Sequence, residues 1–201
     1  MNLDVPLAVA AAALALWLRP WRCVGSEGPP WPWAAGWLLL WLAWSVAPDA
    51  TLRPSVAVVA LLLLMAGWPL AVLCMLGAAL LATLATPLHW ELALQRLVWT
   101  GLVPATGMLA AGAAVRRWLP PHLFAYVLGR GWLGTLLASL LVGLIAPEVL
   151  WEPGLAGTDR WVAHLLLASG EAGLCAMLVG LTAVLRPRWL ATYSERLYPL
   201  P

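Results

Sequence analysis

The stretch that decides the fold runs from residue 55 to residue 85 and reads SVAVVALLLLMAGWPLAVLCMLGAALLATLA. It contains no charged side chain, and it is too long for one membrane crossing, which needs about 20 apolar residues. Gly67-Trp68-Pro69 interrupts it near the middle, and proline favours a break because it lacks a backbone donor. We therefore predict two membrane-spanning helices here, over residues 55–66 and 69–85. A single broken helix is the alternative.

The rest of the chain has the same character. Of its 201 residues, 63% are hydrophobic and only 10% are charged, whereas a soluble domain carries about 25% charged residues. The apolar runs predict seven spans in all, over residues 5–18, 31–47, 55–66, 69–85, 97–115, 122–146 and 161–185. The predicted fold class is therefore all-α: a polytopic helical bundle of about seven transmembrane helices, in one domain covering residues 1–201, with the lipid bilayer as its surroundings.

The arginines predict the orientation of this bundle. Seven spans place more arginines on one side (Arg19, Arg22, Arg116, Arg117, Arg186, Arg188, Arg196) than on the other (Arg53, Arg96, Arg160). Because positive residues favour the cytoplasmic side, we expect an outside amino terminus and a cytoplasmic carboxyl terminus in a bacterial inner membrane. The first apolar run has its arginines after it, unlike a signal peptide, so we expect it to be a retained span. The net charge of +2 gives no reason to expect a nucleic-acid partner.

Two charged residues fall inside predicted spans. Glu171 lies in the middle of the last span, and Arg130 lies in the sixth between Gly129 and Gly131. Charges within a membrane are costly, and they usually face the bundle interior with a partner. Two interpretations stay open: Glu171 is a ligand or gate on a cation path, or it forms an ion pair with Arg130 that fixes the helix register.

Two histidines are candidate metal ligands. His164 precedes Glu171 by seven residues, which places it on the same helical face about 10 Å away, too far to share one ion directly. His89 and Glu91 stand before the fifth span, and imidazole and carboxylate suit divalent cobalt, nickel or zinc. The alternatives are that His164 bonds to lipid or water at the membrane interface and that His89 is an ordinary loop residue. The motifs of soluble enzymes are missing, so we predict that the chain is not an enzyme.

Two stretches carry a resemblance to a known family. The first is LPPHLFAYV at residues 119–127, and the second starts at Gly170-Glu171-Ala172 and continues through LRPRW at residues 185–189. Together with Arg116-Arg117, they resemble the CbiM-like membrane proteins, which are relatives of the substrate-binding permease of energy-coupling factor cobalt and nickel importers. The similarity is to a shortened branch of that family, and it covers most of the chain.

The resemblance implies a permease component that passes Co²⁺ or Ni²⁺ across the membrane, together with separate transmembrane coupling and ATPase subunits. Family members carry a histidine at position two, where this chain has Asn2, and another opening the third span, where it has Arg53-Pro54-Ser55. Family asparagines are replaced by Gln95 and Arg130. We therefore expect a degenerate metal site that keeps Glu171. The alternative is a membrane assembly or interaction partner that keeps the fold without transporting.

Overall fold

The computed structural model describes residues 3–20, 31–45, 55–86, 89–120, 122–145 and 157–193. All regular structure in these ranges is helical. The predictions that involve Asn2, Arg22, Arg53 and Arg196 lie outside the described residues, as does the side chain of Ser55.

The described helices follow the order of the predicted spans. They are α1 (Asp4–Trp17), α2 (Trp31–Ser45), α3 (Ser55–Ala66), α4 (Trp68–Ala85), α5 (Trp90–Gln95), η2 (Arg96–Leu102), α6 (Val103–Trp118), η3 (Ala125–Leu133), α7 (Gly134–Ile145), α9 (Gly157–Leu185) and η4 (Pro187–Trp189). Here η2 and η3 are π-helical segments and η4 is a single 3₁₀ turn. The segments α5, η2 and α6 form one continuous helix, and η3 continues directly into α7.

Four of these helices are long and apolar enough to cross a membrane, namely residues 68–85, 90–118, 125–145 and 157–185. The helices α1, α2 and α3 are apolar but shorter. Leucines are exposed along most of the bundle, among them Leu84, Leu144 and Leu166. Exposed apolar surface on this scale is unusual for a soluble monomer. Length, composition and surface are therefore those of a membrane protein.

The break expected after residue 66 is present. Gly67 has a φ of 78° and donates its N–H to the Leu63 carbonyl at 2.9 Å, which closes α3, and α4 starts at Trp68. A positive φ suits glycine because it has no Cβ, and Pro69 falls in the first turn of α4, where a missing donor costs little. With 12 residues, α3 is about 18 Å long, well short of a ~30 Å hydrocarbon core.

The fifth helix is longer than predicted. It begins at Trp90 instead of residue 97, because residues 90–95, which we expected to precede the span, form α5. It also continues past Pro104, which lies in the first turn of α6 directly after the π-helical η2. Local π-helical adjustments are one way in which an apolar helix provides new partners for the backbone groups that a proline leaves free. The last helix likewise begins four residues early, at Gly157.

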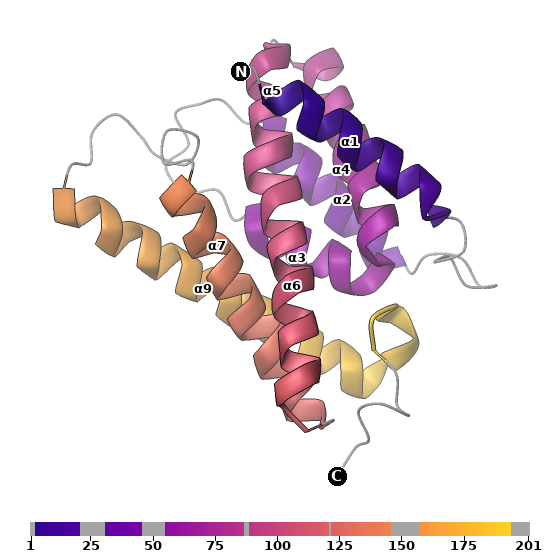
Figure 1. Ribbon diagram of the computed structural model, residues 1–201, viewed down its shortest axis with the longest axis vertical. Helices are drawn as coiled ribbons and strands as arrows, with labels where there is room; N and C mark the ends of the chain where they lie inside the picture. The colour runs from indigo at the N-terminus through magenta and orange to yellow at the C-terminus, as the bar shows by residue number, and fades with distance from the viewer. Residues whose placement is uncertain are drawn as a thin grey trace.

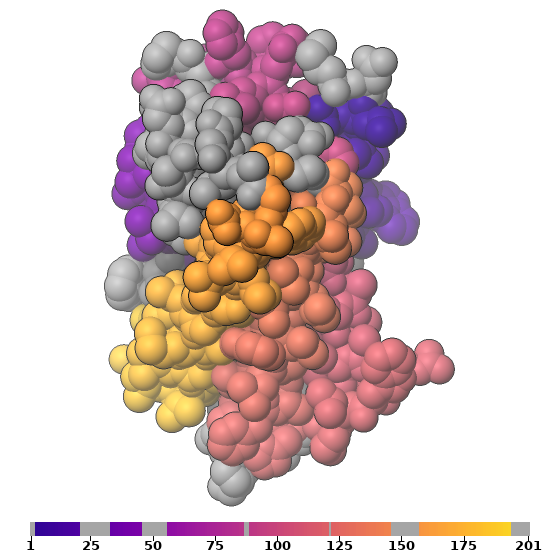
Figure 2. All heavy atoms as spheres, turned by 90° about the vertical axis from the view of Figure 1, so that its left-hand side faces the viewer, coloured from indigo at the N-terminus to yellow at the C-terminus, as the bar shows by residue number. Residues whose placement is uncertain are grey.

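The helices are arranged in two groups. In Figure 1, α1 to α4 gather in the upper right, α6 runs down the centre, α7 lies to its left, and α9 crosses from the far left to the lower right. The molecule turned by 90° shows α9 and the η3–α7 helix exposed on this left-hand face (Figure 2). The core lies where α2, α3 and α4 meet η2, and it includes the buried side chains Trp44, Val59, Met75 and Val98. α3 contacts both groups, since it packs on α2 and α4 and also on α9.

Candidate functional site

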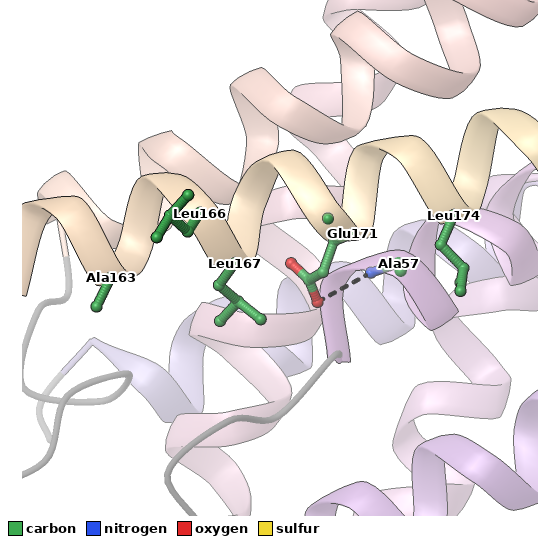
Figure 3. Close-up of a pocket in the computed structure, with 7 residues that line it drawn as sticks. Ala57, Ala163, Leu166, Leu167, Glu171 and Leu174 are labelled. Carbon is green, nitrogen blue, oxygen red and sulfur yellow. Dashed lines mark hydrogen bonds between the residues drawn. The ribbon is translucent and has the colours of Figure 1, made fainter.

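Glu171 lies at the meeting point of α3, α7 and α9. Its side chain is 4% exposed. Oε1 accepts hydrogen bonds from the backbone N–H groups of Val56 at 3.1 Å and Ala57 at 3.4 Å, and Oε2 accepts one from Ser139 Oγ at 3.2 Å. Figure 3 shows the carboxylate extending from α9 to the first turn of α3. The fold thus holds an acid on an α-helix amino terminus.

The short length of α3 explains why an acid lies at its amino terminus. The first four N–H groups of a helix have no partner within it, and lipid supplies none. Glu171 satisfies two of them, and its carboxyl oxygen lies at the positive end of the helix dipole.

His164 reaches the same neighbour from two turns earlier on α9. Its Nε2 forms a hydrogen bond with the Ser139 carbonyl oxygen at 3.0 Å, and the side chain is 6% exposed. Gly143 on α7 makes this possible, because a Cβ there would overlap the imidazole ring. Ser139 therefore contacts both candidate residues, through its hydroxyl and its carbonyl.

A pocket of about 510 Å³ opens beside Glu171, between α9 and the start of α3 (Figure 3). The residues that line it are Ala57, Ala163, Leu166, Leu167, Gly170, Glu171 and Leu174. Among these, Glu171 supplies the only charged or polar side chain. The site is therefore an apolar pocket with one carboxylate in its wall.

Arg130 has different partners, so the Glu171–Arg130 ion pair considered from the sequence is not formed by the described residues. Its Nη1 donates to the Thr192 carbonyl at 3.3 Å, and the guanidinium carbon lies 5.8 Å from the centre of the Tyr126 ring. Its Nε is buried and makes no hydrogen bond within the described part of the chain. A Cβ on Gly112 would lie 2.9 Å from that nitrogen, so a larger residue on α6 at this position would require the Arg130 side chain to shift.

The chain after α9 holds the other end of α3. The backbone N–H groups of Ala191 and Thr192 donate to the carbonyls of Met65 at 3.1 Å and Leu64 at 3.3 Å. The Thr192 hydroxyl donates to Leu64 at 3.0 Å and shares a hydrogen bond of 2.8 Å with Tyr126. Both ends of α3 are therefore held by residues on or just after α9, a feature that sequence reasoning missed.

A second buried charge was also missed. We predicted that Arg96 flanks a span, but its side chain is 3% exposed and donates through Nη1 to the Trp44 carbonyl in the last turn of α2. Asp4 is equally buried and accepts a hydrogen bond of 2.9 Å from Trp99 Nε1. Gln95, a candidate from the sequence, is half-buried at the end of α5. The sequence signal that could have indicated the burial of Arg96 was its position directly before the apolar run Leu97-Val98-Trp99.

The three candidate metal ligands do not come together. His89 is exposed in extended backbone before α5, and Glu91 is exposed in the first turn of that helix, which lies at the top of Figure 1, away from α9. Only His164 and Glu171 share a neighbour. In the ranges that the structure describes, no three His, Cys, Asp or Glu side chains gather closely enough to hold a metal ion.

Comparisons with known proteins found no match, so the function is inferred from the residues described above. The sequence matches no protein-family model, and it is not significantly similar to any curated protein or to any solved structure.

Proposed function

We propose that this chain is a multi-pass, permease-like component of an energy-coupling factor type transporter in a bacterial inner membrane, with Co²⁺ or Ni²⁺ as its substrate. The observation that supports this most is Glu171, a buried carboxylate that lies at the junction of α3, α7 and α9 and lines a pocket. Intramembrane carboxylates usually mark substrate or ion pathways.

The positions of three helix ends agree with an outside amino terminus. α1 begins near the top of Figure 1, whereas α6 and α9 both end in its lower part. Four exposed arginines lie at or just after these two helix ends: Arg116, Arg117, Arg186 and Arg188. The lower end is therefore the side that the positive-inside rule assigns to the cytoplasm.

The donor set around Glu171 agrees with a degenerate metal site. A carboxylate has about four acceptor positions, and three of them on Glu171 take hydrogen bonds from Val56, Ala57 and Ser139. One position is left for a ligand. Because tight transition-metal sites use three or more protein ligands, we expect weak binding of Co²⁺ or Ni²⁺.

The second candidate function is a membrane assembly or interaction partner that keeps the fold without transporting. Its support comes from the two buried charges that contact helix ends, Glu171 on α3 and Arg96 on α2. Both charges then have a structural role, and neither needs a substrate to explain it.

Binding of ⁶³Ni²⁺ to the purified, tag-free protein in detergent micelles tests the transport proposal. We expect saturable binding that falls about tenfold, or 1.4 kcal/mol, in Glu171→Gln. His122→Gln is the matched control, because His122 lies just before η3, where it accepts a hydrogen bond from the Phe124 N–H and stacks on the Phe124 ring. The absence of saturable binding by the wild type, or equal binding by all three proteins, would overturn metal transport at this site. Affinity purification from native membranes then separates the two functions, because a stable complex without an ATPase favours the assembly partner.

A further inference from the structure

We propose that the pocket between α3 and α9 binds a hydrophobic organic monocation, with the cationic centre on the Glu171 carboxylate and the apolar groups on the leucines of α9. This inference goes beyond the proposed function and does not depend on metal transport, because it assigns a different substrate class to the pocket beside Glu171. It differs in the kind of cation, which is an organic ion instead of a bare metal.

The size and lining of the pocket favour an organic ligand. Its volume of about 510 Å³ is far larger than a metal ion needs, and it falls within the range of ~300–1,000 Å³ that small-molecule sites occupy. Such sites are mostly apolar with a few polar groups that fix orientation. Leu166, Leu167 and Leu174 provide apolar walls, and Glu171 provides the one polar side chain among the described lining residues.

The charge of the ligand follows from the surroundings of Glu171. No arginine or histidine among the described residues forms an ion pair with its carboxylate, which is held by two backbone N–H groups and one hydroxyl. A helix amino terminus supplies only about half a positive charge. An organic cation would balance the remaining negative charge of the carboxylate. Its apolar substituents would lower the free-energy cost of entering an apolar pocket.

The route of entry is lateral. Leu166 and Leu174 are 68% and 47% exposed on the surface of α9, and a Cβ added at Gly170 would meet no atom within 4 Å. A bilayer covers surfaces of this kind, so the ligand would partition into lipid first and then reach Glu171 from the side. Quaternary phosphonium and ammonium ions with aryl or alkyl groups have this behaviour.

Two glycines on α9 give a matched pair of variants. Gly170 lines the pocket, whereas Gly173 does not, and a Cβ added at either position would have no neighbouring atom within 4 Å. Leucine at either position therefore meets no steric barrier at its Cβ, and it raises helix propensity by nearly 1 kcal/mol. Gly170→Leu fills the pocket, and Gly173→Leu adds the same side chain to the same helix elsewhere.

The test is equilibrium binding of radiolabelled tetraphenylphosphonium to the full chain in nanodiscs, corrected for partition into empty nanodiscs. We expect saturable binding by the wild type and Gly173→Leu, and at least about a tenfold loss of affinity in Glu171→Gln and Gly170→Leu. Non-saturable binding by the wild type would overturn the proposal, as would wild-type affinity in Gly170→Leu. Thermal unfolding of each variant confirms that a loss of binding is not a loss of fold.

The outcome can be told apart from that of the transport proposal. If tetraphenylphosphonium fails to bind while ⁶³Ni²⁺ binds in a Glu171-dependent manner, the organic-cation site is wrong and metal transport stands. If the opposite is found, the site holds organic cations and the metal assignment is wrong. If neither cation binds, both substrate assignments are wrong and the assembly partner is the remaining candidate.

Discussion

Glu171 and Arg130 are both charged, both come from predicted membrane spans, and lie in different surroundings. Glu171 accepts three hydrogen bonds from three separate groups, two of them at a helix end. Arg130 makes one hydrogen bond of 3.3 Å, lies over the Tyr126 ring, and leaves a buried Nε unpaired within the described residues. The acid is thus tightly held by the fold, while the arginine occupies a space that Gly112 leaves open.

The difference between the two charged residues follows from their positions relative to the short helix α3. α3 has 12 residues and is therefore shorter than a hydrocarbon core is thick, so in a bilayer its end groups would need partners from the protein. Glu171 supplies them at one end, and the backbone of Ala191 and Thr192 supplies them at the other. Arg130 donates to the Thr192 carbonyl, and Thr192 in turn donates to Leu64 of α3, so among the described residues its hydrogen bonding to that helix is indirect.

The largest expected effect is that of removing the acid. Glu171→Ala leaves the Val56 and Ala57 N–H groups without acceptors, and each unsatisfied buried donor costs about 1–3 kcal/mol. We expect a destabilisation of about 3 kcal/mol, measured by thermal unfolding in detergent micelles. Glu171→Gln keeps an oxygen acceptor and should lose less than half as much; equal losses in the two variants would show that the hydrogen bonds do not matter.

A smaller loss of stability is expected from substitutions around Arg130. Gly112→Ala places a methyl group against the guanidinium, and overpacking of this kind costs about 1–3 kcal/mol. Arg130→Met alone should cost little, because the half-buried arginine side chain makes one hydrogen bond of 3.3 Å to the Thr192 carbonyl and its Nε makes none within the described residues. In the double variant the cost of Gly112→Ala should disappear; if it persists, the glycine serves another contact.

The sequence was sufficient for the helical segments and insufficient for their contacts. Apolar runs and the Gly67-Trp68-Pro69 interruption indicated where α3 and α4 lie, because these signals are local. The role of Glu171 depends on α3 and α7, whose residues Val56 and Ser139 are distant from it in the chain. No local pattern encodes such a meeting. Arg96 was misplaced for a related reason, since its partner Trp44 is on another helix.

The seven crossings and the cytoplasmic position of the carboxyl end stay predictions. Cysteine variants at positions 117 and 159, labelled from either side of sealed vesicles, would test the predicted orientation of α6 and α9. We expect position 117 to react only with reagent in the cytoplasm and position 159 only with reagent outside.

The most direct test of the account is amide hydrogen exchange at the start of α3, followed by mass spectrometry of the protein in nanodiscs. If Glu171 holds this helix end, Glu171→Ala should accelerate exchange in a peptide covering Val56 and Ala57, while Glu171→Gln stays close to the wild type. Exchange in α4 should not change in either variant. Equal exchange at Val56 and Ala57 in all three proteins would contradict the account, because the carboxylate would then not be the partner of these groups.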